Sequence, residues 1–132
     1  MNLDVRIEEL LPHPVESVWG ALTDAASISD WLMATHDFRP QVGTRFRMKT
    51  GHLSADGWVE AEVLELEPPR RMVWAWSIAG GADPTCVTFE LAADSGGTRL
   101  TLTHAGEIDS VVGALLAEGW PSRIEVLRRS LV

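Results

Sequence analysis

A ten-residue stretch in the middle of the chain, Glu67 to Trp76, constrains the fold more than any other part of the sequence. It reads Glu-Pro-Pro-Arg-Arg-Met-Val-Trp-Ala-Trp, so a turn at the prolines is followed by large apolar residues at every second position. Because side chains on a β-strand point alternately to its two faces, Met72, Trp74 and Trp76 share one face. That face is a broad apolar wall, which a helix or a ligand has to cover.

The same period of two occurs in several other segments and predicts an antiparallel sheet. Alternating apolar residues mark an N-terminal strand that ends before Pro12, and further strands flank a hairpin loop at Gly51 to Gly57. The strand from Trp58 to Glu67 changes parity near Val63, which predicts a β-bulge. Gly80 and Gly81 predict a turn. The apolar residues expected on one sheet face are Phe46, Met48, Met72, Trp74, Trp76, Val87, Phe89, Leu91, Leu100 and Leu102.

Helical spacing of apolar residues occurs in three segments. Val15 to Leu22 carries one apolar stripe, and Asp24 is expected to be the N-cap of a second short helix. The C-terminal segment has a stripe that Gly119 and Pro121 are expected to weaken or kink. Strands grouped between helices predict an α+β fold in a single domain over residues 1–132. We expect a curved antiparallel sheet of about six strands wrapped around a long C-terminal helix, with two short helices after the first strand.

The composition limits the classes of partner. A net charge of −8 and a pI near 4.8 disfavour nucleic acid and anionic membranes as partners. Arg45, Arg47 and Lys49 follow strand spacing, which indicates a solvated strand face rather than a binding patch. The longest apolar stretch, Val111 to Ala117, is too short to span a bilayer. Cys86 is the only cysteine, which fits a cytoplasmic protein without a disulfide, as a monomer or homodimer.

The apolar sheet face is wider than one helix, so we expect a cavity for a hydrophobic small molecule between the sheet and the C-terminal helix. Four indoles are expected to converge there, and such large rings are hard to pack without gaps. Core packing is the alternative role for each tryptophan. The candidate ligand-binding residues are Trp31, Phe46, Met48, Met72, Trp74, Trp76, Phe89, Leu102, His104, Leu116 and Trp120.

Two sets of residues are weak candidates for acid–base chemistry. His104 has the parity of the inward residues of its strand, so it either transfers protons in the cavity or is hydrogen-bonded within the core. Glu60 and Glu62 form a carboxylate pair if they face inward, but the apolar residues between them favour a solvated position. The histidines have no metal-ligand spacing and no serine lies in a nucleophile elbow, so we predict no metal and no cofactor.

Short motifs along nearly the whole chain resemble one known superfamily. They are Val18-Trp19, Leu22-Thr23-Asp24, Trp31, the segments Phe38 to Gly43, Val63 to Arg71, Val87 to Leu91 and Thr98 to His104, and Gly119-Trp120. Together they resemble the START-like helix-grip (SRPBCC) superfamily, and within it the family similar to the C-terminal domain of the activator of the ninety-kilodalton heat-shock protein ATPase. The resemblance implies a cavity for lipid-, polyketide- or aromatic-like molecules. The superfamily includes polyketide cyclases and co-chaperone domains of the stress response.

These observations leave three hypotheses for function. The first is a binding module that holds an apolar small molecule and has no catalytic residue. The second is an enzyme of the cyclase or dehydratase type that uses His104, with Glu60 as a further candidate. The third is an interaction module that contacts a chaperone or another protein through its surface.

Overall fold

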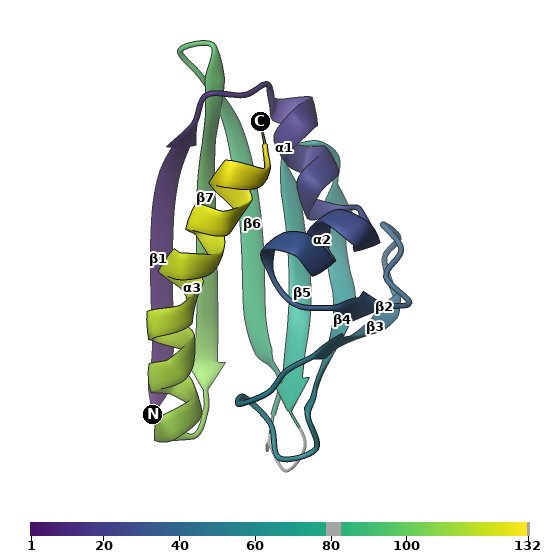
Figure 1. Cartoon of the computed structure of the whole chain (residues 1–132), viewed down its shortest axis with the longest axis vertical. Coiled ribbons are helices and arrows are strands. Elements are labelled where there is room, and N and C mark those ends of the chain that lie inside the picture. The colour runs from purple at the N-terminus through teal and green to yellow at the C-terminus, as the bar shows by residue number, and fades with distance from the viewer. Residues whose placement is uncertain (79–82, 132) are drawn as a thin grey trace.

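A computed structural model, which describes residues 1–78 and 83–131, confirms the α+β fold (Figure 1). Its strands are β1 (Asn2–Leu11), β2 (Thr35–His36), β3 (Arg45–Lys49), β4 (Trp58–Glu67), β5 (Arg71–Ile78), β6 (Thr85–Asp94) and β7 (Gly97–Glu107). They form a seven-stranded antiparallel sheet in the order β1-β7-β6-β5-β4-β3-β2. The sequence predicted about six strands, because β2 has only two residues and is too short to show a period. The predicted turn at Gly80 and Gly81 lies outside the described residues.

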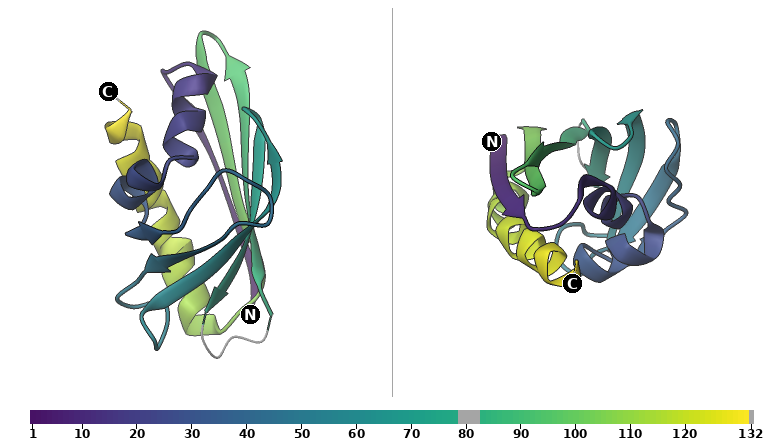
Figure 2. Two further views of the ribbon diagram at one scale, coloured as in Figure 1. Left: turned by 90° about the vertical axis from the view of Figure 1, so that its right-hand side faces the viewer. Right: turned by 90° about the horizontal axis from the view of Figure 1, so that it is seen from above.

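The three helices are α1 (Val15–Leu22), α2 (Ala25–Trp31) and α3 (Ser110–Ser130). All three lie on the concave side of the curved sheet (Figure 2). The predicted cap is confirmed, because the Asp24 carboxylate accepts the Ser27 backbone N–H at 3.0 Å. The α3 helix continues past Pro121 as one element. It crosses the sheet diagonally and covers it only in part (Figure 1).

Strand parity places the apolar residues as expected. The register between β4 and β5 shifts between Val63 and Glu65, which confirms the predicted β-bulge. Leu64 is left 44 % exposed at the bulge, whereas Leu66 is half-buried and pairs with Met72. Each of the ten apolar residues predicted for one face is at most 4 % exposed: Phe46, Met48, Met72, Trp74, Trp76, Val87, Phe89, Leu91, Leu100 and Leu102.

The long helix α3 is fixed to the sheet by an apolar stripe and by an ion pair near its C-terminal end. Leu116, Trp120, Ile124 and Leu127 are buried against the sheet. Near its C-terminus, Arg128 forms an ion pair with Glu9 of β1. In the part of the chain that the structure describes, no helix combines the length and apolar character needed to cross a bilayer.

Candidate functional site

Beneath α2, aromatic side chains fill the space between the sheet and the helices. Trp74 lies at the centre, with its ring centroid 4.8 Å from Phe89 and 5.0 Å from Phe46, both edge to face. Trp31 stacks edge-on against Phe89 from α2 at 6.2 Å. Seven of the sequence-predicted ligand residues are fully buried in the hydrophobic core and line neither of the cavities described below: Trp31, Phe46, Met48, Met72, Trp74, Phe89 and Leu102.

His104 is the central residue of a hydrogen-bonded chain that links α3 to three strands. The Trp120 indole N–H donates to His104 Nδ1 at 3.0 Å, and His104 Nε2 lies 2.7 Å from the Thr85 hydroxyl oxygen. Thr85 in turn donates to the carbonyl oxygen of Trp76 at 3.3 Å. Because an indole only donates, Nδ1 is the acceptor and Nε2 carries the proton of the neutral ring. Both ring nitrogens are therefore occupied by neighbours within the protein.

The surroundings of His104 also keep its ring uncharged. The side chain is 0 % exposed, and this burial lowers the pKa of His104 from 6.5 to about 4. A proton acceptor in an active site needs a pKa near the working pH and an open path to the substrate. His104 has a pKa well below neutrality, and it lines neither cavity.

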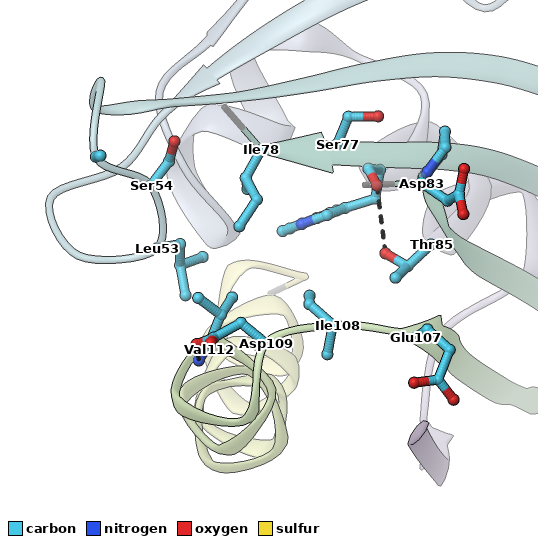
Figure 3. Close-up of a pocket in the computed structure, with 13 residues that line it drawn as sticks. Leu53, Ser54, Ser77, Ile78, Asp83, Thr85, Glu107, Ile108, Asp109 and Val112 are labelled. Carbon is cyan, nitrogen blue, oxygen red and sulfur yellow. Dashed lines mark hydrogen bonds between the residues drawn. The ribbon is translucent and has the colours of Figure 1, made fainter. Parts of the chain in front are cut away.

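The first cavity, of about 560 Å³, opens at the end of the sheet where α3 begins. Ile78 reaches into it from the end of β5, Ile108 from the connection between β7 and α3, and Val112 from the first turn of α3 (Figure 3). Thr85, the hydrogen-bond partner of His104, also lies in its wall. Its lining residues are Leu53 to Ala55, Trp76 to Ile78, Asp83 to Thr85, Glu107 to Asp109, and Val112.

The second cavity, of about 340 Å³, lies between α3 and the loop that joins β3 to β4. Leu115, Leu116 and Trp120 form its α3 wall, and Leu32 and Met33 close it from the end of α2. Lys49 to Leu53 form the opposite side. Both cavities fall in or near the volume range of small-molecule sites, roughly 300–1,000 Å³.

Two residues line both cavities and make them neighbours. Leu53 comes from the loop between β3 and β4, and Trp76 comes from β5. The Trp76 side chain is 2 % exposed, and its indole N–H has no hydrogen-bond partner among the described residues. The indole N–H of Trp74, which lines neither cavity, is likewise buried without a partner among the described residues.

The structure separates the sequence-predicted residues into three groups. Trp76, Leu116 and Trp120 line a cavity. His104 lines neither cavity, but it is hydrogen-bonded to Thr85 and Trp120, which do. The remaining seven are buried in the hydrophobic core. Glu60 is exposed on the opposite face of the sheet, in register with Ser77. Among the described residues, no three His, Cys, Asp or Glu side chains form a group that could hold a metal ion.

Sequence reasoning missed the loop residues of the site, above all Leu53. It is 6 % exposed, although it lies within the segment predicted as a hairpin loop, Gly51 to Gly57. A single leucine between His52 and Ser54 was the available signal, since an isolated apolar residue in a polar loop often packs onto the core. Thr85 was missed because it follows Pro84 at the first position of its strand, where no alternation had yet begun.

Comparisons with known proteins identify a family and several solved structures that this chain is similar to. The family model described as "Activator of Hsp90 ATPase homolog 1-like protein" matches residues 12–131. Protein MLL2253 from Mesorhizobium loti is 32 % identical, with a TM-score of 0.86, and the match covers 97 % of this chain and 96 % of that one. No curated protein sequence gives a significant match.

Two further solved structures are similar. DynU16, described as a putative protein in the dynemicin biosynthetic locus, is 28 % identical with a TM-score of 0.81, and the match covers 97 % of this chain but 46 % of DynU16. CV1439 from Chromobacterium violaceum is 23 % identical with a TM-score of 0.84, over 97 % of this chain and 96 % of that one. At that identity CV1439 shows the fold alone.

Proposed function

Because the chain belongs to the family of Activator of Hsp90 ATPase homolog 1-like proteins, within the START-like helix-grip superfamily, we propose that it holds an apolar small molecule beside Trp76. The observation that carries this proposal is the pair of adjoining cavities, of about 560 and 340 Å³, with Trp76 and Leu53 in the wall of each. A guest there contacts indole and aliphatic side chains.

The cavity predicted from the sequence lies between the sheet and the C-terminal helix, and we propose that the guest occupies the part of that space beside Trp76. The region around Trp74 is occupied by close aromatic contacts, so a guest there would have to displace buried rings. A guest beside Trp76 needs no such rearrangement. We therefore propose Trp76, Leu116 and Trp120, together with Leu53, as the ligand-contacting residues.

The enzyme hypothesis has less support. Acid–base catalysis by His104 requires a ring nitrogen that reaches the substrate, whereas both nitrogens are bonded within the protein. DynU16, by its description, comes from a biosynthetic locus, a setting where small molecules are carried as well as converted. The co-chaperone hypothesis rests on the family's name, and its test is whether the purified protein changes the ATPase rate of a ninety-kilodalton heat-shock protein.

The binding proposal is tested with N-phenyl-1-naphthylamine, an uncharged dye that becomes fluorescent in apolar sites. We expect saturable binding at one site and energy transfer from tryptophan to the dye. Leu53→Trp places a larger side chain in the wall shared by both cavities, and it should weaken dye binding at least about tenfold, or about 1.4 kcal/mol.

Leu64→Trp is the matched control, because Leu64 is 44 % exposed at the bulge and lines neither cavity. Thermal unfolding of both variants establishes that each is folded before binding is compared. Equal dye affinity in the two variants, or no saturable binding to the unsubstituted protein, would contradict the proposal.

A further inference from the structure

The two cavities differ in the sign of the charges around them. The protein has 19 acidic and 11 basic residues, yet the charged or titratable residues that line the second cavity are Lys49, His52 and Arg123, without a carboxylate. Those of the first cavity are Asp83, Glu107 and Asp109. The second cavity is thus a local cationic site on an acidic protein, and charge of that sign favours an anionic group on the guest.

Arg123 is the best placed of these cations. It is exposed on α3, one helical turn from the buried Trp120. Arg128 and Arg129 of the same helix both pair with Glu125, whereas Arg123 has no carboxylate within 4 Å among the described residues. Its guanidinium is therefore available to a ligand and can bind an acid group through two parallel hydrogen bonds.

Lys49 contributes less directly. Its ammonium lies 4.7 Å from the centroid of the Trp58 ring on the outer face of the sheet, and such a cation–π contact is worth about 0.5–1 kcal/mol at an exposed site. Lys49 would give up part of that contact to turn toward a ligand. Arg123 should therefore contribute more than Lys49 to the preference for an anion.

The inner part of the second cavity is apolar. Leu32 and Leu116 are 5 % and 4 % exposed, and Trp76 and Trp120 are each 2 % exposed. An anion could not enter this part without losing its hydration, whereas an apolar group gains from burial there. The cavity is thus graded, with buried indole and leucine side chains inside and the exposed Arg123 at its opening.

We propose that the second cavity takes an amphipathic organic acid, with its apolar part against Trp76 and Trp120 and its anionic group at the opening beside Arg123. This inference rests on the proposed function and specifies the chemical class of the guest.

The test compares two dyes that share one aromatic body. N-Phenyl-1-naphthylamine is neutral, and 8-anilinonaphthalene-1-sulfonate carries one added sulfonate. Titrations in 0.1 M NaCl screen charges beyond about 10 Å, so nearby cations decide the difference. We expect the sulfonate to bind more tightly, and Arg123→Gln to weaken the sulfonate about two- to fivefold while leaving the neutral dye unchanged.

Matched variants make the result specific to this position. Arg129→Gln removes a charge from the same helix at a residue outside the cavity lining, and it should leave both dyes unaffected. Arg123→Lys keeps the charge and should keep most of the preference. In displacement of the neutral dye, dodecanoate should compete better than dodecan-1-ol, and Arg123→Gln should reduce that advantage.

The outcomes separate this inference from the proposed function. If the neutral dye binds but Arg123→Gln and Arg129→Gln have equal effects on the sulfonate, the inference is wrong and the binding function stands. If the alcohol competes as well as the acid, the inference is wrong in the same way. If neither dye binds the unsubstituted protein, both proposals are wrong.

Discussion

His104 is held as a neutral ring, and its protonation is expected to destabilise the fold at mildly acidic pH. Burial lowers the pKa of His104 from 6.5 to about 4, so between these values the unfolded state binds more protons than the folded state. The stabilisation is present above pH 6.5 and is lost as the pH falls toward 4. At about 1.4 kcal/mol per pH unit the total is roughly 3 kcal/mol, of which about 2 kcal/mol is lost between pH 7 and pH 5.

The assay is urea unfolding followed by tryptophan fluorescence at pH 7, 6 and 5, with His104→Gln as the comparison. A glutamine amide keeps an acceptor for Trp120 and a donor for Thr85, but it does not titrate. The variant is expected to be less stable at pH 7, yet to lose about 2 kcal/mol less than the unsubstituted protein on going to pH 5. His52→Gln, at an exposed histidine, should follow the unsubstituted curve.

Titration of carboxylates does not account for the difference in pH dependence between His104→Gln and the unsubstituted protein. A hydrogen bond from Arg99 holds the pKa of Asp94 below 3.8, so this group titrates below the pH range of the assay, and it is the same in both proteins. Parallel losses of unfolding free energy in His104→Gln and the unsubstituted protein would refute the reasoning. So would a ring that NMR finds protonated on both nitrogens at pH 6.

Three further predictions concern stability, each measured as a change in unfolding free energy at pH 7. Trp120→Phe removes the donor to His104 Nδ1 and should destabilise the protein by about 1–3 kcal/mol. If it lowers the unfolding free energy less than Trp19→Phe does, the Trp120–His104 hydrogen bond does not contribute to stability. Gly119→Ala places its methyl where no atom lies within 4 Å and should stabilise α3 by about 0.5–1 kcal/mol. Gly113→Ala should give no such gain, because its added carbon would lie 2.5 Å from the Met1 sulfur and 3.1 Å from Ile108. Equal effects of the two substitutions would contradict this packing. Asp109→Ala removes the acceptor for two N–H groups at the start of α3 and should cost about 1 kcal/mol, with Asp109→Asn as the control that retains a cap.

The alternation of apolar residues along each strand was enough to predict which side chains face inward. Met72, Trp74 and Trp76 are all buried on one face, and the parity change at Val63 marks a real bulge. These predictions succeed because the direction of a strand side chain depends on its own position in the strand and on little else. The Asp24 cap was equally predictable, since a cap is a contact between residues three positions apart.

The location of the empty space could not be predicted in this way. The sequence gives Trp74 and Trp76 the same parity, yet Trp74 is enclosed by two phenylalanine rings from β3 and β6, whereas Trp76 borders both cavities. Whether a gap remains beside an indole depends on the sizes and rotamers of neighbours that come from distant segments. Leu53 illustrates this, because its role in both cavity walls depends on how the loop between β3 and β4 folds back.

By itself, the sequence determined the sheet apart from the two-residue β2, its inner face and the helices that cover it. These features follow from local periodicity and from contacts between residues close in the chain. The tertiary structure alone decided that His104 is a neutral residue bonded to Thr85 and Trp120, and that the cavities lie at the Trp76 end of the sheet. Hydrogen-bond partners 16 and 19 residues away, and the volume left between packed rings, are set by how the elements meet in space.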